Sequence, residues 1–128
     1  MTVVLPREMV FAFVEDGTLE VFPDQATATR EYEGVDVESG TVRFYGVGGT
    51  YLKPVFVRSN KGGKLFGALS WVQSGEYHLV PDAVASEDSF ALSLFETVAL
   101  EPNPWFASME ELKTALAQEG VSVQYTPS

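Results

Sequence analysis

Cysteine is absent from this 128-residue chain, and histidine occurs once, at His78. Without cysteine, the chain has no disulfide framework, no cysteine-based zinc site and no thiol nucleophile. A single histidine also excludes zinc motifs that place two histidines on one helix. We therefore expect neither a metal site nor a cofactor.

Long apolar runs are also missing. The longest, Met9 to Val14, has the length of a strand, whereas crossing a bilayer requires roughly 18 apolar residues. The first residues lack the basic segment and apolar stretch of a secretory signal. Because an acidic chain also repels anionic lipid, we expect a cytoplasmic protein without membrane contact.

Basic residues are scarce and unevenly placed. The chain has 18 acidic and 8 basic residues, for a net charge of −10. Residues 1–38 and 76–128 each contain nine acids, whereas residues 39–75 contain five bases and no acid. A chain of this charge repels a phosphate backbone, so we expect no nucleic-acid binding and favour a basic protein as partner. The basic middle either balances acidic neighbours within the fold or meets a charged partner itself.

Short apolar and alternating segments predict a strand-rich domain. The expected strands are 9–14, 18–22, 35–37, 42–47, 51–58, 65–72, 76–80 and 121–125. Pro54 lacks the N–H that a central strand uses, so its strand is expected at a sheet edge or a bulge. Tight glycine turns favour antiparallel pairing. We expect an α+β single domain over residues 1–128, mainly an antiparallel sheet of five to six strands with about three helices packed on one face.

Three helices are predicted, at 24–33, after Ser86 and after Ser108. Ser108 and Glu111 have the spacing of a capping box. In the helix after Ser86, five apolar residues recur at helical spacing and predict one core-facing side. They are Phe90, Ala91, Leu94, Phe95 and Val98.

One glycine-rich basic segment, Lys61-Gly62-Gly63-Lys64, falls in a predicted polar loop over 59–64. Backbone N–H groups at two glycines can turn inward, and two lysines can neutralise a phosphate, which indicates an anion site. The segment is not a Walker A motif, because Leu65 follows Lys64. A solvated turn is the alternative interpretation, since glycine and asparagine are the usual turn residues.

His78 is placed by alternation on the same side of its strand as Glu76. An imidazole oriented by a carboxylate can act as a general base near neutral pH. However, no motif places a serine nucleophile or a second acid beside it. We therefore favour an ordinary strand histidine and do not expect an enzyme.

Four residues are candidate partner-binding positions. Asp36 and Glu38 share one face of an extended strand, and turn-associated acids are the alternative. They lack the surrounding ligands of a calcium loop. Trp71 and Trp105 are large aromatics that anchor a protein interface if exposed, or lock the fold if buried.

The chain resembles a group of small, uncharacterised bacterial proteins, some of which are similar to immunity proteins that accompany secreted toxins. The resemblance covers residues 9–118 and rests on strands, turns and a capped helix. Its markers are Val35-Asp-Val37, Phe44-Tyr45, Gly49, Leu52-Lys-Pro-Val-Phe56, Trp71 to Tyr77 and Asn103-Pro-Trp-Phe106. It implies a cytoplasmic protein that binds and blocks a toxin, and an acidic charge suits a basic toxin. No catalytic residue is implied.

Three functions follow as hypotheses. The first is a protein-binding module, possibly an immunity-type inhibitor of a basic toxin or other basic protein, with acidic side chains for steering and aromatic anchors for affinity. The alternative is a small-ligand or anion-binding domain, or a minor hydrolase, that uses Lys61, Lys64 and His78. A structural or oligomeric role is a third hypothesis.

Overall fold

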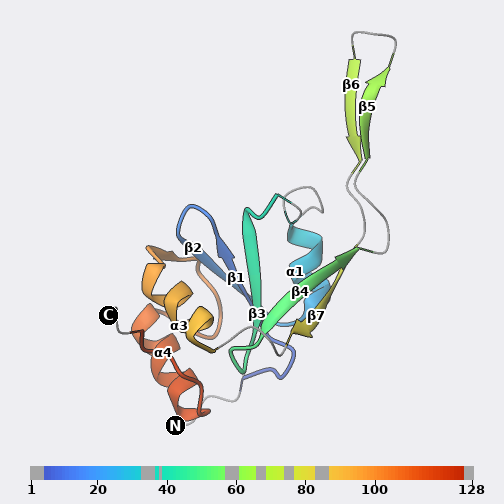
Figure 1. Cartoon of the computed structure of the whole chain (residues 1–128). Helices are drawn as coiled ribbons and strands as arrows, with labels where there is room; N and C mark the ends of the chain where they lie inside the picture. Colours follow the sequence, from blue (N-terminus) through green and yellow to red (C-terminus); the bar gives the residue numbers. More distant parts are fainter. Residues whose placement is uncertain are drawn as a thin grey trace.

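The computed structural model describes residues 5–32, 37, 39–56, 61–65, 69–73, 77–82 and 87–125, and of 61–65, 69–73 and 87–88 it describes the backbone alone. Within these residues, six strands form one sheet in the order β7-β4-β3-β1-β2-β8 (Figure 1). The strands are β1 (Val10–Val14), β2 (Thr18–Phe22), β3 (Val42–Gly46), β4 (Tyr51–Phe56), β7 (Tyr77–Asp82) and β8 (Ala99–Leu100). All pairings are antiparallel except the short parallel contact of β2 with β8.

Three helices and a separate two-stranded ribbon complete the described architecture. The helices are α1 (Gln25–Glu31), α3 (Glu87–Glu96) and α4 (Met109–Gln118). The ribbon pairs β5 (Lys61–Leu65) with β6 (Leu69–Gln73). The expected α+β single domain with a mainly antiparallel sheet of five to six strands is confirmed, and the described sheet has six.

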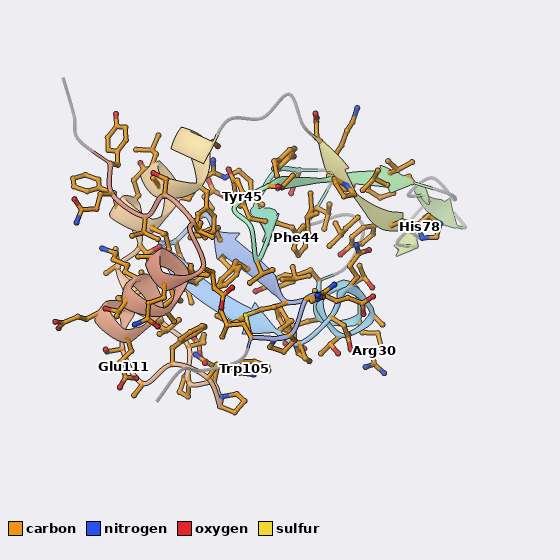
Figure 2. The ribbon with its side chains drawn as sticks, turned by 90° about the horizontal axis from the view of Figure 1, so that it is seen from below. Arg30, Phe44, Tyr45, His78, Trp105 and Glu111 are labelled. Carbon is orange, nitrogen blue, oxygen red and sulfur yellow. The ribbon has the colours of Figure 1, made fainter. Side chains whose placement is uncertain are left out.

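The central strand β1 divides the interior into two cores, because its side chains alternate and both faces are covered. The first core contains Met9, Phe11, Phe13, Leu19, Val21, Tyr45, Phe90, Leu94, Phe106, Leu112, Leu116 and Val121. The second core contains Val10, Ala12, Phe22, Ala28, Val37, Val42, Phe44, Leu52, Tyr77 and Leu79. Adjacent residues of β3 show the same division, with Tyr45 and Phe44 in different cores (Figure 2).

The helices therefore do not all pack on one face, and that part of the sequence prediction is wrong. Phe90 of α3 and Leu112 of α4 belong to the first core, whereas Ala28 of α1 belongs to the second. Both faces are apolar along β1, where Phe11 and Ala12 are fully buried. A sheet with two apolar faces requires cover on both, which the short and weakly apolar α1 helps to supply.

Side-chain hydrogen bonds hold α1 against the sheet. Asp24 caps the helix by accepting from the backbone N–H of Thr27 at 2.8 Å. At the other end, the Tyr32 hydroxyl donates to a Glu20 carboxylate oxygen at 2.7 Å, and the Tyr77 hydroxyl donates to the Tyr32 carbonyl at 2.8 Å. Burial, followed by the hydrogen bond to Glu20, raises the pKa of the Tyr32 phenol. The neutral phenol is thus the form that the fold stabilises.

We expect Tyr32→Phe to lower the free energy of unfolding by about 1 kcal/mol at neutral pH, the usual contribution of one hydrogen bond. Because the folded pKa of Tyr32 is raised above the unfolded value, its stabilisation is complete below about pH 10 and declines at higher pH. Urea unfolding of the wild type and Tyr32→Phe at pH 7, 9 and 10.5 measures the difference. A difference that widens with pH would contradict this assignment.

Several local predictions are corrected. Residues 61–64 form part of strand β5 and not a loop, because they pair with β6 from Lys61↔Gln73 to Lys64↔Ser70. Residues 121–125 form no strand, and the edge beyond β2 is occupied instead by β8. Of the predicted strand 35–37, only Val37 is among the described residues, and it is buried in the second core.

Pro54 lacks a hydrogen-bonded neighbour on one side, as expected for a strand proline, although its strand is not at the edge of the sheet. Strand β4 lies between β3 and β7, but its pairing with β3 ends at Leu52. At Pro54, β4 therefore pairs only with β7, opposite Leu79. The missing N–H is tolerated because one side of the strand is unpaired there.

The C-terminal helix begins and ends as predicted. The Ser108 side chain accepts from the backbone N–H of Glu111, while the Glu111 carboxylate accepts from the N–H of Ala107, one residue before the position in a standard capping box. Gly120 follows α4 with a φ of 84°. A positive φ is the conformation that ends helices and that glycine adopts without strain.

Candidate protein-binding surface

The turn between β1 and β2 forms one wall of a surface hollow. The Asp16 carboxylate accepts from the backbone N–H of Thr18 at 2.9 Å, which stabilises the turn. Hydrogen bonds from the side chain and backbone of Thr18 hold the pKa of Asp16 below its usual value. The Gly17 carbonyl accepts from Val98 at 2.7 Å and from Ala99 at 3.3 Å. The turn is thus joined to the segment that follows α3.

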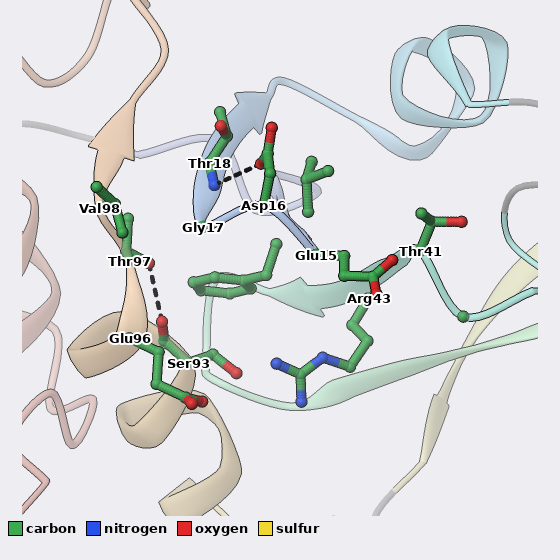
Figure 3. A pocket seen from close by; sticks show the side chains of 13 residues that line it. Glu15, Asp16, Gly17, Thr18, Thr41, Arg43, Ser93, Glu96, Thr97 and Val98 are labelled. Atoms are coloured by element: carbon green, nitrogen blue, oxygen red, sulfur yellow. Dashed lines mark hydrogen bonds between the residues drawn. The ribbon is translucent and has the colours of Figure 1, made fainter.

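The C-terminal turn of α3 forms the opposite wall. Ser93 is buried, and its hydroxyl donates to the Ser89 carbonyl at 2.9 Å. The Thr97 hydroxyl donates to the Ser93 carbonyl at 2.8 Å, which satisfies an acceptor near the helix end. These bonds fix the last turn of α3 and place Glu96 at the rim of the hollow (Figure 3).

The hollow itself measures about 430 Å³ and carries more acidic than basic groups. Its described charged lining consists of Glu15, Asp16 and Glu96 with a single cation, Arg43 (Figure 3). All four side chains are exposed, while Phe13 belongs to the buried first core. The hollow therefore combines an apolar base with carboxylates at its rim, which suits a cationic side chain with an aliphatic stem.

Two large apolar side chains near the end of α3 are exposed, one of them in the hollow. Val98 lines the hollow and is 83% exposed, and Phe95 of α3 is 58% exposed. The sequence predicted both on the core face of the helix, and both predictions are wrong. Helix α3 ends at Glu96, so Val98 lies beyond it, and Phe95 instead contacts Tyr125 with ring centroids 5.6 Å apart. Aromatic and aliphatic groups surrounded by polar ones are typical of protein interfaces.

A second acidic groove of about 590 Å³ runs beside α4 and includes Trp105. The Asn103 side chain accepts from the N–H groups of Trp105 and Phe106 at 3.0 and 2.8 Å, which fixes the chain before the helix. Trp105 is partly buried and packs against the first core, so it both closes the core and lines the groove. Glu110 and Glu111 are exposed in the same groove.

The other candidate residues are not brought to this surface by anything the structure describes. Asp36, Glu38 and Glu76 lie outside the described residues. Lys61, Gly62, Gly63 and Lys64 are in β5, where Gly63 is paired with Trp71 of β6. Extended pairing does not turn successive N–H groups into an anion-binding concavity, so this backbone does not add support for the anion site, which stays a prediction.

His78 lies as alternation predicted. It is exposed on β7 between the buried Tyr77 and Leu79, and it is far from α3 and α4 (Figure 2). It is opposite Val55 of β4. Glu15, Asp16 and Glu96 were missed as a group, because the sequence places them in separate turns and only the β2–β8 contact brings the turns together.

Comparison with protein-family models, curated proteins and solved structures found no match. None of the helices among the described residues combines the length and apolar character that crossing a bilayer requires. In the same part of the chain, no three potential metal-ligating side chains of histidine, cysteine, aspartate or glutamate lie together.

Proposed function

We propose that this chain is a protein-binding module for a basic partner and, most concretely, an immunity-type inhibitor that neutralises a basic toxin in the cytoplasm. The observation that carries the proposal is the joining of three exposed carboxylates and the exposed Val98 in one hollow. The acidic groups would steer a basic partner, and the apolar groups would supply contact area.

The shape of the hollow favours an arginine or lysine side chain of the partner. The aliphatic stem would lie against Phe13 and Val98, and the cationic end would reach Glu15 and Glu96. Ion pairs exposed on a surface contribute little individually, but three acids acting together raise the association rate and select a basic surface. Arg43 beside them would pair with an acidic group of the same partner.

Capture from a native-host lysate, followed by mass spectrometry and titration calorimetry with the purified partner, tests this proposal. We expect a single stoichiometric basic protein, whose affinity for Glu15→Lys/Glu96→Lys is at least tenfold weaker than for the wild type. Higher salt should weaken binding to the wild type and matter less for the variant.

The matched control is Glu31→Lys/Glu119→Lys, which changes the net charge equally at exposed positions near the C-terminal ends of α1 and α4. Its affinity should stay within about twofold of the wild type if the hollow is the site. If both variants lost affinity for the partner equally, the net charge of the chain and not the hollow would explain the loss, which would contradict the proposal. Capture of an acidic partner would also overturn the proposal. Restored growth on co-expression with the partner is the expected result for an inhibitor.

A further inference from the structure

One face of the β4–β7 pair is left open by the helices. On β4, Lys53 and Val55 alternate with the buried Leu52, and on β7, His78 and Val80 alternate with the buried Tyr77 and Leu79. The second core covers the face of the buried residues. On the opposite face of the pair, Tyr51 packs against the first core. The side chains of Val55 and Val80 on that face are 42% and 43% exposed.

The register places the four exposed residues in a compact square. Val55 is opposite His78, and Lys53 is opposite Val80. Diagonal neighbours across an antiparallel pair are roughly 7–8 Å apart, so the two valines form one apolar patch and the two basic side chains flank it. We call these four residues the open face.

The charge of the open face is opposite to that of the molecule. Arg43 of β3 shares its side of the sheet with Tyr45, which is paired with Tyr51 of β4, and therefore adds a third basic group next to the open face. On the same face of the β4–β7 pair, Asp82 of β7 lies opposite Tyr51 and is the acidic residue among the described residues there. In a chain of net charge −10, this is a local basic surface with an apolar centre.

β7 is an edge strand of the described sheet. Among the described strands, β7 pairs with β4 alone and ends the sheet. An exposed sheet edge accepts an added strand through main-chain hydrogen bonds, and alternate side chains then give specificity. A strand added there would place every second side chain beside His78 and Val80.

We propose that β7 and the open face bind an extended acidic segment of another protein, with acidic and apolar residues in alternation. The segment adds a strand beside β7, and its carboxylates pair with Lys53 and the imidazole N–H of His78. Lys53 is opposite Val80, on the side of the pair from which a long side chain could approach the added strand. Arg43 also lines the acidic hollow, but the four residues of the open face do not, so this proposal rests on different side chains from the proposed function.

The net negative charge does not oppose this binding at physiological salt. Charges separated by more than about 8 Å are largely screened at that ionic strength. The charged side chain of the open face itself, Lys53, therefore decides the interaction, because Arg43 already lies beside the acids of the hollow. At low salt, the distant acids would repel the same segment, so affinity should fall or stay level as salt is removed.

The test uses the full ¹⁵N-labelled chain and a capped eight-residue peptide of alternating glutamate and valine. We expect chemical-shift changes at the backbone amides of β7 and at Lys53 and Val55. A peptide with lysine in place of glutamate should bind at least tenfold more weakly. A peptide with four glutamates followed by four valines should also lose affinity, because it cannot present one acidic and one apolar face.

Two variants with matched charge changes complete the test. Lys53→Glu/His78→Glu should weaken binding of the alternating peptide roughly tenfold, whereas Lys113→Glu/Gln118→Glu, on α4 and away from the open face, should leave it within about twofold. Shifts confined to other strands, or equal binding of the lysine peptide, would overturn the proposal. Sedimentation that shows a dimer abolished by Lys53→Glu would also overturn it and assign the face to a second copy of this chain.

Discussion

Replacing Phe90 by alanine is expected to lower the free energy of unfolding by about 3–5 kcal/mol. Phe90 is fully buried, and its ring meets Phe11, Phe13 and Tyr45 at centroid distances of 5.6, 5.8 and 5.4 Å. The variant loses these contacts and leaves a cavity between α3 and the sheet. Domains of this size are stabilised by about 5–15 kcal/mol in total, so the change is a large part of it.

Phe95→Ala is the matched control for this prediction. It removes the same atoms from the same helix, but Phe95 is 58% exposed, and among the described residues its ring contact is with Tyr125. We expect a loss below about 1 kcal/mol. Urea unfolding of both variants by circular dichroism measures the difference. Similar losses for both would contradict the placement of α3.

Gly17→Ala is expected to destabilise the chain by about 2–4 kcal/mol, from two separate causes. Gly17 has a φ of 94°, which is strained for any residue with a Cβ. An added Cβ would also lie 2.8 Å from Cγ2 and 3.2 Å from Cβ of Val98, closer than van der Waals contact allows. The turn would have to separate from β8 or deform.

Gly40→Ala isolates the first of these causes. Gly40 has a φ of 81°, but an added Cβ would meet no atom within 4 Å, so backbone strain of about 1–2 kcal/mol is the expected loss. In a Val98→Ala background, the cost of Gly17→Ala should fall toward that of Gly40→Ala, because Cγ2 of Val98 is gone. A double-mutant cycle by thermal or urea unfolding measures this coupling. An unchanged cost would show that the contact with Val98 is unimportant.

The same contact connects stability with the acidic hollow. Gly17 and Val98 hold the β1–β2 turn against the end of α3, and the acids of the hollow come from these two segments. Gly17→Ala should therefore weaken binding of a basic partner as well as stability. Phe90→Ala leaves the contact between Gly17 and Val98 intact. It should weaken partner binding only because fewer molecules of the variant are folded.

Local rules predicted those parts of the fold in which neighbouring residues decide the outcome. The cap at Ser108, the end of α4 at Gly120 and the alternation around His78 are set within a few residues, and the structure has them as expected. Burial of β1 from Val10 to Phe13 also follows from its continuous apolar run. Trp105 was identified as an aromatic anchor, although its half-buried position could not be derived.

Residues far apart in the sequence decided the rest. Apolar periodicity gives the direction of a helix face but not which side of the sheet the helix covers, so α1 and α3 were expected on the same side. Phe95 and Val98 continue the apolar pattern of Phe90, but α3 ends before Val98 and the core is already filled. A strand as short as β8 has no sequence signal, since its two residues are fixed by pairing with β2.

The sequence by itself determined the fold class, the acidic charge and the absence of thiol chemistry, because composition and local periodicity suffice for these. Only the tertiary structure decided where the acids meet and which face of β4 and β7 stays open. Glu15 and Glu96 are separated by some eighty residues in the chain and are joined through hydrogen bonds to Gly17. Such contacts depend on packing across the whole sheet, and no local pattern encodes them.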